Sequence, residues 1–131
     1  MSRRDARRLA LRILYESDVA GTPAAEVMER HAEAGESVEE FARELVEGTG
    51  EHLGEIDELI QRHAKDWTVA RMPAVDRAIL RLACFEIVYL ENVPASVAVN
   101  EAVEAAKELS TEESGRFVNG VLGAVAREAE G

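Results

Sequence analysis

The chain has 131 residues, of which 47% are apolar and 31% are charged, and it contains a single cysteine, Cys84. This length suits one domain over residues 1–131 with one hydrophobic core, and the composition is typical of a folded globular protein. One cysteine excludes a disulfide within the chain, and no apolar run approaches the roughly 20 residues that cross a membrane. We therefore expect a cytoplasmic protein without a membrane segment.

The formal net charge of −11 is unevenly distributed. Five arginines and one aspartate give residues 1–12 a charge of +4, so the rest of the chain carries −15. Such a chain presents one basic face and repels polyanions elsewhere. The pattern predicts local, weak binding of RNA at the N-terminus and allows a basic protein partner on the acidic remainder.

Apolar residues recur at three- and four-residue spacing along the chain, whereas no segment keeps the alternation of a strand. The first helix is expected over residues 3–20 and ends at Gly21, and a short second helix over residues 24–34 follows Pro23. A capping-box pattern begins a third helical segment over residues 37–64. Glycines interrupt this segment and predict a kink or a break; they are Gly48, Gly50 and Gly54.

The second half of the chain begins with its most apolar segment, residues 75–90. Apolar side chains occur almost all round this segment, which predicts a central helix packed on several sides. A helix through residue 109 follows, and a capping-box pattern at residues 110–113 opens a last helix. The fold class is therefore all-α, a compact bundle of six to seven helices, with two three-helix halves around the central apolar helix as the expected form.

No pattern in the sequence indicates catalysis or a cofactor. Residues 48–54 are glycine-rich but lack the spacing and the preceding strand of a phosphate-binding loop. His52 and His63 would lie roughly 16 Å apart on one helix, too far to share a metal ion. Neighbouring acidic residues point in different directions on a helix, and the serines lack a nearby histidine–aspartate pattern. We expect no enzymatic activity, no cofactor and no metal site.

Arginines near the N-terminus recur at helical spacing. Arg4, Arg8 and Arg12 follow one another every four residues, with Arg3 and Arg7 beside them. On a helix they form a cationic stripe next to an apolar face. Arginine suits nucleic acid because its planar group donates two parallel hydrogen bonds to phosphate and stacks on bases. The alternative is a solvated helix whose arginines pair with carboxylates of the same chain.

Four motifs, in order, resemble the NusB family of transcription antitermination factors. They are residues 3–18 (RRDARRLALRILYESD), 75–83 (VDRAILRLA), 94–109 with VNEAVEAAK at the centre, and 117–122 (FVNGVL). The resemblance is weakest over residues 22–66. It implies an all-helical, non-enzymatic protein that binds the boxA element of ribosomal RNA leader transcripts. Its partner would be the ribosomal protein NusE, in a complex with RNA polymerase, NusA and NusG.

The same resemblance implies which residues form the site. The N-terminal RNA contacts would be Arg3, Arg4, Arg7 and Arg8. A second RNA surface within residues 109–119 would include Leu109, Glu113, Phe117 and Asn119. Tyr15 and Asp76 would lie at or near the NusE surface. Phe117 and Asn119 also fit structural roles, the first in the core and the second in helix packing.

This sequence departs from the family pattern at three positions. Asp5 interrupts what is often a longer run of arginines, which predicts weaker RNA binding. Leu109 stands where some members have an aromatic residue, and Glu113 replaces a frequent aspartate. Base stacking at Leu109 and the RNA contact of Glu113 therefore remain open.

Three other functions remain open on the sequence. A helical protein-interaction module, such as a homodimer, would bury the arginine face without contacting RNA. An RNA-modifying enzyme is a second alternative, because NusB-like domains also occur fused to RNA methyltransferases. That alternative requires a following α/β domain, and the sequence ends at Gly131 without one. A helix-turn-helix DNA-binding protein is the third, but no second basic helix is visible.

Overall fold

The computed structural model describes residues 2–131, which form seven α-helices, one short 3-10 helix and no strand. The elements are α1 (Arg3–Ala20), α2 (Ala24–Glu33), α3 (Glu40–Glu51), α4 (Leu53–His63), η1 (Val69–Arg71), α5 (Ala74–Tyr89), α6 (Ala95–Leu109) and α7 (Glu112–Glu130). The all-α class predicted from the sequence is confirmed. Within the described residues, no helix is both long enough and apolar enough to cross a membrane.

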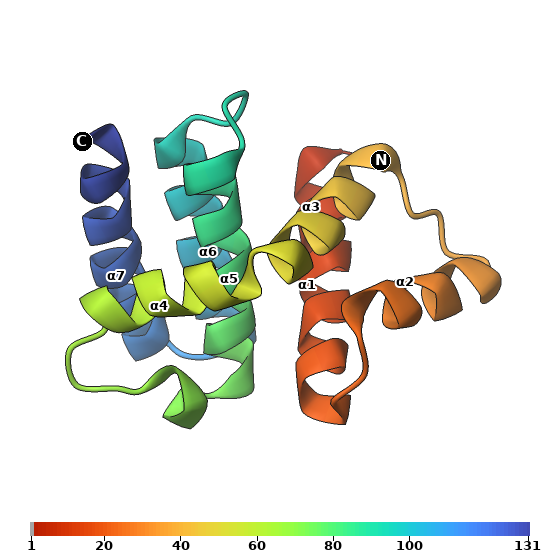
Figure 1. The fold of residues 1–131 in the computed structure, drawn as a ribbon, viewed down its shortest axis with the longest axis horizontal. Helices are drawn as coiled ribbons and strands as arrows, with labels where there is room; N and C mark the ends of the chain where they lie inside the picture. Colours follow the sequence, from red (N-terminus) through yellow and green to blue (C-terminus); the bar gives the residue numbers. More distant parts are fainter. Residues whose placement is uncertain (1) are drawn as a thin grey trace.

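The helices form two groups that share α5 (Figure 1). Helices α1, α2 and α3 pack against one another on one side, and α5, α6 and α7 do so on the other. Helix α4 continues roughly where α3 ends and packs on α5 and α7. Helix α5 contacts helices of both groups, as its apolar composition predicts.

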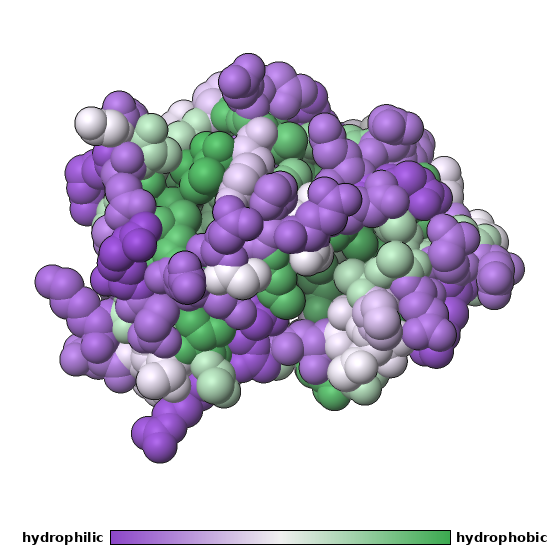
Figure 2. Space-filling model, viewed as in Figure 1, coloured by the Kyte–Doolittle hydropathy of each residue, from purple (hydrophilic) through white to green (hydrophobic). Residues whose placement is uncertain are grey.

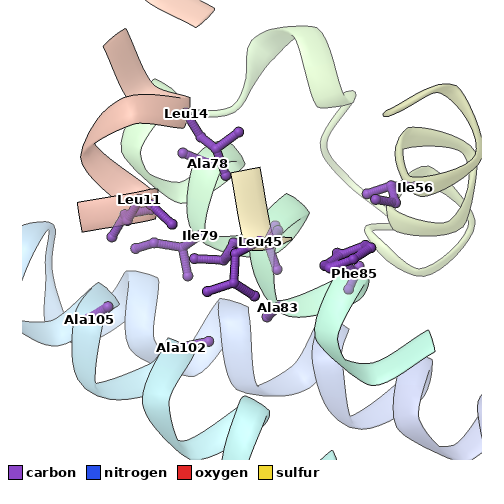
Figure 3. Packing of buried hydrophobic residues seen from close by; sticks show 14 of the residues in the cluster. Leu11, Leu14, Leu45, Ile56, Ala78, Ile79, Ala83, Phe85, Ala102 and Ala105 are labelled. Atoms are coloured by element: carbon purple, nitrogen blue, oxygen red, sulfur yellow. The ribbon is translucent and has the colours of Figure 1, made fainter. Parts of the chain in front are cut away.

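The core lies where α5 meets its neighbours (Figure 3). Leu11 of α1 and Leu45 of α3 lie on either side of Ile79 of α5, and Ala102 and Ala105 of α6 lie below it in this view. The two alanines leave room for α6 to pack closely on α5. Burying a large apolar side chain such as Ile79 or Leu45 stabilises the fold by about 1.5–3 kcal/mol.

The ends of α1 follow the sequence pattern. The Ser2 side chain accepts a hydrogen bond from the backbone N–H of Asp5 at 3.1 Å, which satisfies one of the free donors of the first turn. Gly21 ends the helix in the left-handed conformation at φ 69°, where glycine carries no steric penalty.

Two other helix starts differ from their predicted positions. Helix α3 begins at Glu40 after Glu39, and no side chain caps it, so the capping box predicted at residues 37–40 is wrong. Helix α7 is capped by Thr111, whose hydroxyl accepts from the Ser114 backbone N–H at 2.9 Å. The predicted box had placed this cap one residue earlier, at Ser110.

The expected break in the third helical segment occurs at His52, between α3 and α4. The nearby glycines have different roles. A Cβ atom at Gly48 would overlap the Phe85 ring, so the absence of a side chain allows α3 to approach α5. A Cβ atom at Gly50 or Gly54 would meet open space.

Ion pairs reinforce the junction between the two groups of helices. Arg77 of α5 donates to Asp18 of α1 at 2.6 Å, and Arg81 of α5 donates to Asp57 of α4 at 2.8 Å. Arg81 also lies 3.4 Å from Asp18. Burial opposes ionisation of Arg81, but hydrogen bonds and charge from Asp57 and Asp18 outweigh it, so the pKa of Arg81 is raised. These pairs hold α1 and α4 against the central helix.

Candidate nucleic-acid interface

Four arginines of α1 lie at the surface; we call Arg3, Arg4, Arg8 and Arg12 the arginine edge. The side chains of Arg4 and Arg12 are 55% and 63% exposed, whereas that of Arg8 is 23% exposed. Arg4, Arg8 and Arg12 follow one another every four residues, so their charges lie along one face of α1, whereas Arg3 begins the neighbouring face that also carries Arg7. Arg4, Arg8 and Arg12 therefore form a cationic row on α1, with Arg3 beside it.

Each arginine of the edge meets a group of its own chain. Arg4 lies 3.9 Å from Glu101, Arg8 lies 3.0 Å from Glu108, and Arg12 lies 3.5 Å from Glu36. The Arg3 guanidinium lies over the Phe41 ring, 4.5 Å from its centre. The pairs of Arg4 and Arg12 are solvent-accessible, and pairs of this kind contribute only about 0–1 kcal/mol, whereas the Arg8 Nη2 atom that faces Glu108 is buried. A phosphate can therefore replace the carboxylates beside Arg4 and Arg12 at low cost.

Arg7 is separate from the edge because its side chain is only 8% exposed. Its Nε donates to Glu86 Oε1 of α5 at 2.8 Å, and its guanidinium lies 5.4 Å from the centre of the Phe41 ring. Burial raises the pKa of the Glu86 carboxyl, although the charge and hydrogen bond of Arg7 lower it in part. The sequence placed Arg7 in the same stripe as its neighbours, but the structure places it beneath them, where it joins α1 to α5.

A shallow groove connects α1 with the end of α6. It is lined by Arg4, Asp5, Arg8, Arg12, Glu108 and Leu109. Leu109 is 49% exposed there and offers an apolar surface beside the arginines. The structure thus brings Arg4, Arg8 and Leu109, which the motifs assigned to two separate RNA surfaces, into one continuous groove.

The other residues of the second predicted surface lie on α7. Glu113 and Asn119 are exposed, whereas Phe117 is half-buried and packs against the core. None of the three lines the groove beside α1. They lie on α7, beyond the turn that joins it to α6.

Two basic residues of the same segment were not singled out by the motifs. Lys107 and Arg116 are both exposed. The Lys107 side chain crosses Gly115 so closely that a Cβ atom there would lie 2.8 Å from Lys107 Cγ. A count of positive charges between residues 107 and 119 would have drawn attention to both positions.

The two residues assigned to a protein partner differ in exposure. Tyr15 is 38% exposed on α1. Asp76 is buried, and its Oδ2 accepts a hydrogen bond from Ser114 Oγ at 2.9 Å, which links the first turns of α5 and α7. Its Oδ1 is also buried and has no hydrogen-bond partner within the described residues. Asp76 is therefore a linking group inside the fold rather than an exposed contact.

The described residues hold no cluster of three or more histidine, cysteine or acidic side chains that could bind a metal ion. Cys84 is buried in α5, and burial raises the pKa of its thiol to about 12. The thiol is therefore protonated at neutral pH and is not a nucleophile.

These observations define a small helical domain in which the arginine-bearing helix α1 lies beside the turn that joins α6 to α7. Residues 4–127 match the model of the NusB family, and the chain belongs to that family.

Curated relatives carry the same family name. The chain is 51% identical to the transcription antitermination protein NusB of Symbiobacterium thermophilum, a match that covers all of this chain and 93% of the relative. It is 49% identical to that of Pelotomaculum thermopropionicum, with 99% and 92% covered.

Solved structures agree with the sequence relatives. T. maritima NusB superimposes with a TM-score of 0.89 at 34% identity, covering 98% of this chain and 92% of that one. A chain from the crystal structure of the antitermination factors NusB and NusE in complex with double-stranded RNA superimposes with a TM-score of 0.86 at 30% identity. That match covers 96% of both chains.

Proposed function

We propose that this chain is a non-enzymatic transcription antitermination factor that binds the boxA element of ribosomal RNA leader transcripts together with NusE. The observation that carries the proposal is the groove in which Arg4 and Arg8 meet Leu109. Support comes from the relatives named as transcription antitermination proteins and from the related structure that contains NusE and RNA. In the cell the pair would act within a complex of RNA polymerase, NusA and NusG.

RNA binding at the arginine edge proceeds by exchange of partners. Arg4 and Arg8 release Glu101 and Glu108 and donate to phosphate oxygens instead, with two parallel hydrogen bonds per guanidinium where the geometry allows. The released carboxylates remain near the RNA and repel it. The edge alone therefore binds RNA weakly and with a strong dependence on salt.

Residues 109–119, from the end of α6 into α7, supply contacts to bases, whereas the arginine edge contacts phosphates. Leu109 offers an apolar surface against which an unstacked base can lie, and the exposed Asn119 amide can donate to and accept from a base edge. Arg116 adds a positive charge, while Glu113 accepts hydrogen bonds from base amino groups. Phe117 supports this surface from within because it packs against the core.

The buried residues position the interface. Arg7 holds α1 against α5 through Glu86, so its proposed role is to orient the arginine edge rather than to contact phosphate. Asp76 holds α5 to α7 and so fixes the surface that would meet NusE. Tyr15 is exposed and would contact NusE directly. Two modest contacts, one with RNA and one with NusE, strengthen each other because each raises the local concentration of the other partner.

Fluorescence anisotropy with labelled boxA RNA and with a scrambled RNA, each with and without purified NusE, tests this function. We expect boxA RNA to bind the pair more tightly than either protein alone. Equal affinity with and without NusE would contradict the proposal. Sedimentation with and without RNA distinguishes this function from the alternative, a homodimer that buries the arginine edge. If RNA binds through that edge, it competes with self-association.

The arginine edge is tested by its salt dependence. The double variant Arg4→Ala, Arg8→Ala removes two phosphate contacts, so the slope of log affinity against log salt should become less steep by about 1.4. The matched control Arg30→Ala, Arg62→Ala removes the same charge from α2 and α4 and should leave the slope unchanged. A slope that the edge variant does not alter would show that these arginines are structural.

A further inference from the structure

Helix α3 carries a row of carboxylates along its exposed face. Glu40, Glu44, Glu47 and Glu51 follow at three- and four-residue spacing, so they lie on one face, and all four are exposed. We call this row the acidic ridge. Within residues 2–131, no hydrogen bond or ion pair reaches the side chains of Glu44, Glu47 or Glu51. The one basic residue of α3, Arg43, instead lies 3.4 Å from Glu29.

On the side of the ridge that faces α5, the surface is hollowed and aromatic. This aromatic hollow is lined by Glu44, Glu47, Gly48, Glu51, His52, Phe85 and Tyr89. The rings of His52 and Tyr89 stack with centres 3.9 Å apart, and the Phe85 ring lies 5.7 Å from that of Tyr89. The Tyr89 hydroxyl donates to Glu55 at 3.1 Å. A stacked aromatic surface rimmed by carboxylates suits a guanidinium or ammonium group.

On the side of the ridge that faces α1, a second hollow is mainly apolar. Leu14 of α1, Val46 and Gly50 of α3 and the half-exposed Leu53 line this apolar hollow. Thr49 also lines it; the residue is fully buried, and its Oγ1 has no hydrogen-bond partner within the described residues. A hydroxyl left unpaired in a buried position is costly, and a ligand that pairs with it relieves the cost.

The ridge belongs to both hollows. Glu47 and Glu51 line the aromatic hollow and the apolar hollow alike. Figure 2 shows hydrophilic side chains running along α3 and α4 with hydrophobic surface on both sides of them. A ligand seated here would meet negative charge at the centre and apolar surface beside it.

We propose that the acidic ridge and its two hollows form a docking site for a basic, amphipathic segment of another protein. An arginine or lysine of that segment lies between Glu47 and Glu51 and stacks on the Tyr89 face. An adjacent apolar side chain enters the hollow beside Gly50. Charge complementarity selects this occupant, because the unpaired carboxylates repel RNA and attract a cation. The site is separate from the arginine edge, so the proposal does not depend on the RNA-binding function.

The test measures binding of a fluorescein-labelled amphipathic peptide of leucine and arginine to the full chain. The native protein should bind it, and the triple variant Glu44→Gln, Glu47→Gln, Glu51→Gln should weaken binding by about tenfold. A control triple, Glu33→Gln, Glu104→Gln, Glu130→Gln, changes the net charge equally at exposed positions elsewhere and should change affinity by less than about twofold. Equal losses in the two triples would overturn the proposal, since they would indicate general charge attraction.

A second pair of variants tests the apolar hollow. Gly50→Trp places a large side chain in the hollow and should weaken peptide binding by about fivefold, whereas Gly50→Ala should not, because a Cβ atom there has open space. Unaltered binding by Gly50→Trp would overturn the two-hollow site.

Sedimentation of the native chain without peptide tests whether a second copy of this chain occupies the site instead. Self-association that the ridge triple abolishes would show that a second copy, and not another protein, fills the site. Circular dichroism confirms that each variant is folded.

Discussion

The arginine edge and the acidic ridge are two charged faces of one small domain, and they differ in how their charges are balanced. On the edge, Arg4, Arg8 and Arg12 each lie near a carboxylate of the same chain. On the ridge, Glu44, Glu47 and Glu51 have no counterion within the described residues. The comparison shows that a net charge of −11 does not describe either face. Ligands of the edge must displace internal partners, whereas a ligand of the ridge supplies a missing one.

The largest expected effect separates Arg7 from the edge above it. Arg7→Ala leaves Glu86 buried without its partner, and losing one member of a buried pair costs about 3–5 kcal/mol of unfolding free energy. Arg12→Ala, in a pair exposed to solvent, should cost less than about 1 kcal/mol. Urea unfolding at neutral pH measures both. Similar costs for the two variants would show that Arg7 belongs with the edge and not with the core.

The pH dependence of the same variant provides an internal check. Burial raises the pKa of Glu86 in the folded state, so folding favours the protonated carboxyl. The contribution of Glu86 to the free energy of unfolding therefore falls as the pH rises from the unfolded-state pKa of about 4.5 through the folded-state pKa. Without Arg7 the raised pKa should rise further. The deficit of Arg7→Ala relative to the native protein should therefore be smaller at pH 5 than at pH 7. A deficit that does not vary with pH would mean that Glu86 is not the source of the cost.

The next effect concerns the glycines beneath and beside the ridge. Gly48→Ala should destabilise the protein by about 1–3 kcal/mol because the new Cβ atom overlaps the Phe85 ring. Gly50→Ala should stabilise it by about 0.5–1 kcal/mol, since alanine favours a helix and the Cβ atom meets open space. Thermal unfolding of the two variants checks the difference. Effects of the same sign would mean that α3 does not approach α5 at Gly48 as the structure shows.

The helices were predictable because their signals are local. Three- and four-residue spacing marks α1 and α5, and Gly21 ends the first helix where the pattern stops. The capping box at residues 37–40 failed although its spacing was correct: α3 begins at Glu40, after Glu39, and no side chain caps it. Local propensity is a weak signal when packing opposes it.

The site was harder to predict because its contacts are distant in sequence. Arg7 has the same residue type and spacing as its neighbours, and only Glu86, 79 residues away, makes it a buried group. Asp76 is a charged residue at the start of the apolar segment over residues 75–90, and its contact with Ser114, 38 residues away, is what buries it. The glutamate spacing of the ridge is visible in the sequence, but its two hollows are completed by α1 and α5. Sequence therefore indicates which charges share a helix face and not what lies opposite them.

The smallest expected effect tests whether the ridge is truly uncompensated. Glu47→Gln removes one like-charge pair with Glu44 and another with Glu51, and each such pair costs a helix about 0.2–0.5 kcal/mol. Glu47 also lies near the C-terminal end of α3, where the helix dipole disfavours negative charge. Urea unfolding in low salt should therefore show a gain of about 0.5–1 kcal/mol that shrinks in 1 M salt, because a Debye length of about 3 Å screens exposed charges. Glu108→Gln provides the contrast: it also removes a like charge four residues from Glu104 near the C-terminal end of α6, but it removes the partner of Arg8 as well, so its gain should be smaller. If the two substitutions stabilised the protein equally, the ridge and the edge would not differ in charge balance, and the ridge would have no electrostatic reason to bind a basic partner.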